Sequence, residues 1–128
     1  CLKHNFTCPQ IMAKGGITRF HSVRNALEKV PEGALVAVHD GVRPLVSVSL
    51  VKEMFEKAEN VNGLIPVVPC VDTMRVLRKN GELLEPVPGA VADRSILYGV
   101  QTPQVFQSEI LKHNTSFFAN LRNCFVSL

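Results

Sequence analysis

Closely spaced cysteines are missing from this 128-residue chain. Its four cysteines lie at positions 1, 8, 70 and 124 and include no CxxC pair. Neither a disulfide framework nor a zinc ribbon is therefore expected, and the reducing cytoplasm is the expected compartment. No apolar run approaches the ~18 residues needed to cross a bilayer. The N-terminus also lacks the basic-then-apolar pattern of a signal peptide, so no membrane partner is expected.

A strong charge of one sign is also missing. The chain has 14 Lys and Arg against 11 Asp and Glu, a net charge of +3. This excess is too mild to favour nucleic acid as the main partner, but it suits an anionic small molecule. The composition, 46% hydrophobic and 20% charged, is ordinary for a globular protein. The length predicts a single domain covering residues 1–128.

Helical and extended patterns alternate along the first half of the chain. Ser22 is a good N-cap, and apolar residues at helical spacing after it predict a helix over residues 22–30. The short apolar run 34–39 predicts a strand buried on both faces. A serine-capped helix beginning near residue 47 and a strand at residues 63–69 follow. This alternation predicts right-handed crossovers and a mostly parallel α/β sheet, with helices on both faces.

The pattern changes after residue 70. Two short extended runs flank Asn80-Gly81, which is a strong hairpin turn signal. We expect this hairpin to project from the sheet as an arm at about residues 71–95. A further strand is expected to end at Thr102-Pro103, and Ser108 can cap a short last helix. Aromatic and aliphatic residues at loosely helical spacing predict a packing helix or a frayed end over residues 117–125.

The stretch VAVHDGVRPLV, residues 36–46, carries the main chemical signal. Asp40 lies at the carboxyl end of a predicted strand, where open α/β sheets bind their ligands. A carboxylate there can bind Mg²⁺, which prefers oxygen ligands. Gly41 and Pro44 shape a turn that would direct Arg43 toward an anion. The alternative is that Asp40 caps the turn and pairs with Arg43 on the surface.

Other polar residues are weaker candidates. Gly15 and Gly16 precede a predicted helix and could let backbone N–H groups approach a nucleotide, although such pairs are usually plain loops. Residues at segment ends, Thr73, Arg94 and Thr102 among them, are individually typical of caps or surface pairs. A structural imidazole at a strand end is the favoured interpretation of His39, ahead of a catalytic base.

Four segments together resemble the 2-C-methyl-D-erythritol 4-phosphate cytidylyltransferase family. They are GGITRFHSVRNAL, VAVHDGVRPLV, PVVPCVDTMR and DRSILYGVQTPQVF, in the family's order over roughly residues 14–112. Four ordered motifs are far more specific than any one of them. The family's N-terminal Gly-rich loop and its later acidic segment have no evident counterpart. The chain is therefore expected to be the central part of such an enzyme, that is, an incomplete nucleotidyltransferase domain.

The resemblance implies a Rossmann-like nucleotidyltransferase fold and a homodimer joined through the hairpin arm. It also implies a reaction in which CTP and a sugar-alcohol phosphate, 2-C-methyl-D-erythritol 4-phosphate, give the CDP-linked product and pyrophosphate with Mg²⁺. A sister cytidylyltransferase acting on ribitol 5-phosphate shares some of the motifs and stays an alternative. A truncated, non-catalytic remnant of the same fold is a second alternative.

The resemblance further implies roles for single residues. Asp40 would bind Mg²⁺ and Arg43 would hold the substrate phosphate, and these two would be the catalytic residues. The remaining roles are in substrate binding: Gly16 and Ser22 would contact the cytidine part, Thr73 and Arg94 the sugar phosphate bound in the partner subunit, and Thr102 would help close that pocket. Ile17 stands where the family usually has a polar residue.

Overall fold

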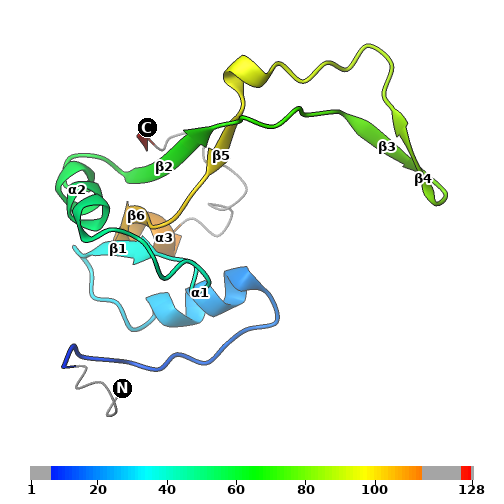
Figure 1. Cartoon of the computed structure of the whole chain (residues 1–128). Coiled ribbons are helices and arrows are strands. Elements are labelled where there is room, and N and C mark those ends of the chain that lie inside the picture. Colours follow the sequence, from blue (N-terminus) through cyan, green and yellow to red (C-terminus); the bar gives the residue numbers. More distant parts are fainter. Residues whose placement is uncertain (1–6, 114–124, 128) are drawn as a thin grey trace.

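The computed structural model describes residues 7–113 and 125–127, which form three helices, a single 3-10 turn and seven strands (Figure 1). In chain order they are α1 (Arg19–Leu27), β1 (Leu35–Val38), α2 (Val48–Ala58), β2 (Gly63–Pro69), β3 (Leu77–Asn80), β4 (Leu83–Pro86), η2 (Arg94–Ile96), β5 (Tyr98–Val100), β6 (Gln104–Gln107), α3 (Ser108–His113) and β7 (Phe125–Ser127). Among the described helices, none has the length and apolar character needed to cross a bilayer.

Five of the strands form one sheet in the order β1-β6-β2-β5, with β7 beside β2. The α/β class is confirmed, and β1 and β2, which the alternation assigns to one sheet, are not direct neighbours in it. β6 lies between them and is antiparallel to both, pairing Leu35 with Gln107 on one side and Gly63 with Phe106 on the other. β1 and β2 still run in the same direction, and β7 pairs parallel with β2.

Helices cover both faces of this sheet, as predicted. On one face Leu27 of α1 and Leu111 of α3 pack with Ile65 and Phe106 in one core cluster. On the other face Met54 and Ala58 of α2 pack with Leu64 and Val105. Because neighbouring residues of a strand point to opposite faces, the central strands β2 and β6 contribute to both clusters.

The caps of the first two helices differ in how well the sequence predicts them. Ser47 caps α2 as expected, accepting a hydrogen bond from the Leu50 N–H (3.2 Å). The expected cap of α1 was wrong. Thr18 is the N-cap, and Ser22 lies within the first turn of the helix. Phe20 continues the apolar spacing of Val23 and Leu27 into this first turn, so the earlier start was readable from the sequence.

Two strand predictions need correction. β1 was expected to be buried on both faces, but Leu35, Val36 and Val38 are half-buried and Ala37 is exposed. β6 was not predicted, because its four residues follow Pro103 too closely to show a clear alternation. By contrast, β2 has the bounds that the sequence predicts, residues 63–69.

α3 ties the start of β1 to the sheet. Ser108 is the first residue of this helix and is fully buried. Its backbone N–H donates to the Ala34 carbonyl (2.8 Å), and its Oγ accepts from the Ala34 N–H (3.3 Å). Glu109 accepts a hydrogen bond from the Gly33 N–H, which holds the pKa of this carboxyl below its ordinary value.

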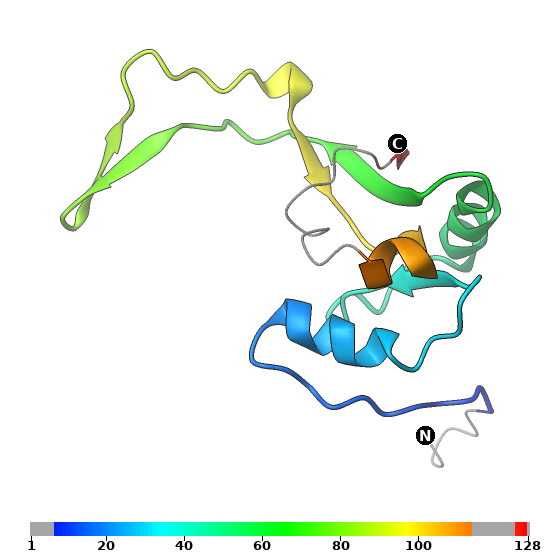
Figure 2. The same cartoon turned by 180° about the vertical axis from the view of Figure 1, so that it is seen from behind.

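β3 and β4 form the predicted hairpin, separate from the main sheet. Gly81 sits at its turn with φ of +61°, a conformation that glycine adopts without strain. Figures 1 and 2 show this arm extending away from the sheet on long connections. The predicted tail helix lies largely outside the described residues, and Phe125, counted in it, belongs to strand β7.

Candidate active site

The turn after β1 fixes the backbone of Asp40 and Arg43. The Arg43 N–H donates to the Asp40 carbonyl (3.0 Å), and the Asp40 N–H donates to Thr102 Oγ1 (3.3 Å). His39 Nε2 donates to the Arg43 carbonyl (2.9 Å). This contact agrees with the structural role predicted for His39. The turn therefore places Asp40, Arg43 and Thr102 together.

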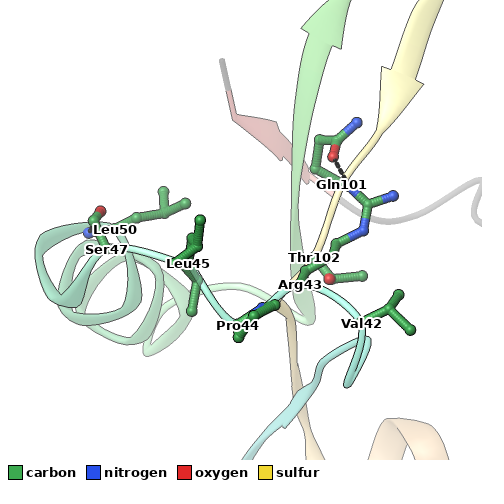
Figure 3. Close-up of a pocket in the computed structure, with 9 residues that line it drawn as sticks. Val42, Arg43, Pro44, Leu45, Ser47, Leu50, Gln101 and Thr102 are labelled. Atoms are coloured by element: carbon green, nitrogen blue, oxygen red, sulfur yellow. Dashed lines mark hydrogen bonds between the residues drawn. The ribbon is translucent and has the colours of Figure 1, made fainter.

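The carboxylate of Asp40 lies between two arginines. Arg19 Nη2 is 2.9 Å from Asp40 Oδ1, and Arg43 Nε is 3.2 Å from Oδ2. The Asp40 side chain is 25% exposed, so it reaches solvent at the edge of the sheet. Arg43 also donates through Nη1 to Gln101 Oε1, and in Figure 3 its side chain points toward Gln101. The Asp40–Arg43 surface pair that the alternative interpretation expected exists, as part of a larger network.

A cavity of about 530 Å³ opens beside this turn. Its volume falls within the range of about 300–1,000 Å³ typical of small-molecule sites. Its walls combine apolar and polar side chains with one positively charged side chain, that of Arg43 (Figure 3). The lining residues are Val42, Arg43, Pro44, Leu45, Val46, Ser47, Leu50, Gln101 and Thr102. A mainly apolar pocket with one guanidinium suits a small ligand that carries an anionic group.

The loop before α1 is closed by a contact between two predicted site residues. The Gly16 N–H donates to Ser22 Oγ (2.9 Å), and the Ser22 hydroxyl donates to the Thr18 carbonyl (3.2 Å). A Cβ atom on Gly16 would lie 2.2 Å from His21 Cβ, which is far closer than real carbon atoms approach. Glycine is therefore required at residue 16 by this close approach to the helix.

We expect Gly16→Ala to lower the free energy of unfolding by about 1–3 kcal/mol, the usual cost of forcing a carbon into filled space. Urea unfolding of both proteins measures this difference. Gly15→Ala is the matched control, because a Cβ there would meet no atom within 4 Å apart from those of its chain neighbours. We expect it to change stability by under about 0.5 kcal/mol. Equal effects of the two substitutions would contradict the close approach.

The two residues assigned to the arm lie apart from the Asp40 turn. Arg94 is in η2 at the base of the arm, and its Nη1 donates to the Val71 carbonyl (3.3 Å). Asp93 caps η2, and hydrogen bonds from the Ser95 hydroxyl and backbone N–H hold its pKa below the ordinary value. Thr73 is exposed in the connection to β3. Between the described residues of one chain, no hydrogen bond or ion pair joins Thr73 or Arg94 to Asp40.

Arg19 and Gln101 are site residues that the sequence reasoning missed. Both lie inside the motif segments, Arg19 after the Gly pair and Gln101 in the QTPQ stretch. Position in a motif was the available signal, but it does not identify a partner. The structure supplies the partners: Arg19 reaches Asp40, 21 residues away, and Gln101 reaches Arg43, 58 residues away.

Asp40 has the chemistry to hold a divalent cation. No cluster of three or more His, Cys, Asp or Glu side chains occurs in the described ranges 7–113 and 125–127. This excludes an all-protein cage there but fits Mg²⁺, which usually binds one or two carboxylates, several waters and substrate phosphates. Each carboxylate oxygen of Asp40 accepts one arginine N–H and has a further lone pair. The donor set therefore fits Mg²⁺ bound with a phosphorylated substrate.

Comparison with known proteins gives consistent results. The family model described as 2-C-methyl-D-erythritol 4-phosphate cytidylyltransferase matches residues 3–121, beyond both ends of the stretch 14–112 that carries the motifs. A protein of that name from Bacteroides thetaiotaomicron is 43% identical over 112 residues, which cover 88% of this chain and 48% of that protein. One from Porphyromonas gingivalis is also 43% identical over 112 residues, covering 88% and 47%.

The crystal structure of the Thermus thermophilus protein of the same name superposes with a TM-score of 0.69 at 32% identity, covering 91% of this chain and 57% of that one. The Rossmann-like nucleotidyltransferase fold is thereby confirmed. The chain spans about half the length of the curated relatives it matches. Since the family model matches most of the sequence, the chain belongs to the 2-C-methyl-D-erythritol 4-phosphate cytidylyltransferase family.

Proposed function

We propose that the protein transfers CMP from CTP to 2-C-methyl-D-erythritol 4-phosphate and releases pyrophosphate, as a step in isoprenoid synthesis. The observation that carries this proposal is the arrangement around Asp40. In a chain of this family, an exposed carboxylate at the end of β1 lies between two guanidinium groups and beside a cavity of about 530 Å³. Such a site can bind two phosphorylated substrates at once.

In the proposed reaction an oxygen of the sugar phosphate attacks the α-phosphorus of CTP. A new P–O bond forms as the bond from the α-phosphorus to the bridging oxygen of the β-phosphate breaks, and pyrophosphate leaves with that bonding pair. Positioning and charge stabilisation suffice for such a transfer, without a covalent enzyme intermediate. Arg43, fixed by Gln101 and by the turn, would hold the sugar phosphate in line for attack.

Asp40 would hold Mg²⁺ together with the phosphates of CTP. When bound, Mg²⁺ withdraws charge from the phosphate oxygens. Gly16 and Ser22, which already contact each other, would bind the cytidine part through the loop before α1. Thr102, which is buried and accepts a hydrogen bond from the Asp40 backbone N–H, would help close the pocket.

The arm would complete the site of a second subunit. Thr73 lies in the connection from β2 to β3 and Arg94 lies in η2, and among the described residues no hydrogen bond or ion pair joins either of them to Asp40. In a homodimer joined through the arm, they would reach the sugar phosphate bound by the partner. This dimer would explain why Thr73 and Arg94 lie apart from Asp40 within one chain, although all three belong to the motifs of the same family.

Turnover of CTP with two sugar phosphates tests the proposal. We expect the full-length protein to release pyrophosphate with methylerythritol phosphate and at least about tenfold more slowly with ribitol 5-phosphate, because one site fitted to a branched tetrol phosphate excludes a longer chain. A coupled pyrophosphate assay measures both rates. Equal turnover of the two would overturn the substrate assignment, and no turnover of either would overturn the proposed reaction.

A further inference from the structure

The two arginines that hold Asp40 are fixed to different degrees. Arg43 donates to Asp40 Oδ2 and to Gln101, and both its backbone polar groups are hydrogen-bonded within the turn. Arg19 is 62% exposed, and within the described part of the chain its guanidinium donates to Asp40 Oδ1 alone. Arg43 is therefore the anchored partner of Asp40, and Arg19 is the one that can leave.

The charges around Asp40 oppose a cation that arrives by itself. One carboxylate between two guanidinium groups leaves the cluster with a single net positive charge. This charge repels a lone divalent cation, and Arg19 already occupies Oδ1 as its hydrogen-bond donor. A triphosphate changes the balance, since guanidinium groups bind phosphate oxygens through paired, charge-assisted hydrogen bonds.

We propose that Arg19 is an exchangeable partner of Asp40, which holds Oδ1 in the unliganded protein and transfers to phosphate oxygens when a nucleotide arrives with its divalent cation. The transfer leaves Oδ1 to the cation, while Arg43 keeps Oδ2. This inference rests on the proposed function, because it takes a nucleotide–cation complex as the ligand. Its consequence is that the cation binds together with the nucleotide and only weakly before it.

Binding of Mn²⁺ to the full-length protein, followed by electron paramagnetic resonance, tests the exchange without any turnover. We expect Arg19→Ala to bind bare Mn²⁺ about three- to tenfold more tightly than wild type, the effect of one unit charge at close range in water. The same variant should bind the Mn²⁺ complex of a non-hydrolysable CTP analogue about three- to tenfold more weakly. Effects of the same sign in both measurements would overturn the exchange.

Three further variants locate the effect. Arg19→Lys keeps the charge and should bind bare Mn²⁺ as wild type does. Lys57→Ala breaks another surface ion pair, with Glu53 (2.6 Å), and should also match wild type. The double variant Arg19→Ala/Asp40→Asn should not show the gain in affinity for bare Mn²⁺ that is expected of Arg19→Ala alone. A gain of equal size in Lys57→Ala, or one that persists in the double variant, would assign the effect to general charge and overturn the proposal.

The outcomes separate this inference from the proposed function. If Asp40→Asn weakens Mn²⁺ binding but Arg19→Ala leaves both affinities unchanged, the metal site stands and the exchange is wrong. If the two opposite shifts occur but neither sugar phosphate is turned over, the exchange stands and the proposed reaction is wrong. Arg19→Gln repeats the test if Arg19→Ala shows an altered circular dichroism spectrum.

Discussion

Asp40→Asn should reduce the turnover of CTP with methylerythritol phosphate by about 10²- to 10³-fold, the loss usually seen when one electrostatic contact to the reacting charge is removed. The amide keeps the shape of the side chain but lacks the negative charge that binds a divalent cation. Initial rates of pyrophosphate release by the full-length protein, at saturating CTP and sugar phosphate, measure the change. Retention of more than about a tenth of the wild-type rate would contradict the metal role of Asp40.

Stability should respond much less than activity. Asp40→Asn removes two ion pairs whose arginines are 62% and 46% exposed. Exposed pairs of this kind contribute about 0–1 kcal/mol each, so the thermal midpoint should shift by a few degrees at most. Glu53→Gln is the matched control, since it removes one carboxylate from the surface ion pair with Lys57. We expect this control to leave turnover unchanged.

Phe106→Ala should lower the free energy of unfolding by about 3–5 kcal/mol, the range observed for buried aromatic residues. Phe106 is fully buried in β6, where it packs with Leu27, Ile65 and Leu111 beneath α1 and α3. Because whole domains are stable by only about 5–15 kcal/mol, this single change would remove a large share of the stability. Urea unfolding followed by circular dichroism gives the difference directly.

Two further variants control this measurement. Ile96→Ala truncates an apolar side chain that is 73% exposed, and we expect a change within about 0.5 kcal/mol. Phe106→Leu keeps most of the buried volume and should remain folded if Phe106→Ala does not. A loss for Phe106→Ala no larger than that for Ile96→Ala would show that Phe106 does not lie in the core.

The parts of the fold that the sequence predicts are those with strong local patterns. β2 is a short, mainly apolar run between turn residues, α2 has a serine cap and an apolar stripe, and the hairpin has Asn80-Gly81 at its turn. β6 was missed for the opposite reason. β6 pairs with residues of β2 that lie more than 40 positions earlier and with residues of β1 that lie about 70 positions earlier. No local sequence pattern encodes pairing over such separations.

The candidate site also has residues that the local sequence indicates and residues that only tertiary contacts reveal. Asp40 could be proposed from the sequence, because a charged residue directly after an apolar strand needs solvent or a ligand. Arg19 could not, because its significance depends on an ion pair with a residue 21 positions later. Thr73 and Arg94 were expected on a projecting arm, away from Asp40 of the same chain, but how far that arm reaches depends on three-dimensional geometry that no local pattern gives.

The central place of β6 has a consequence for biosynthesis. β1 and β2 emerge from the ribosome well before residues 104–107, the strand that both of them require as a neighbour. Until that strand is made, Leu64 and Ile65 have no packing partner on it, and the nascent polypeptide exposes two unjoined apolar strands. Closing contacts over such long sequence separations is slow. Chaperone protection is most valuable to this protein during that interval.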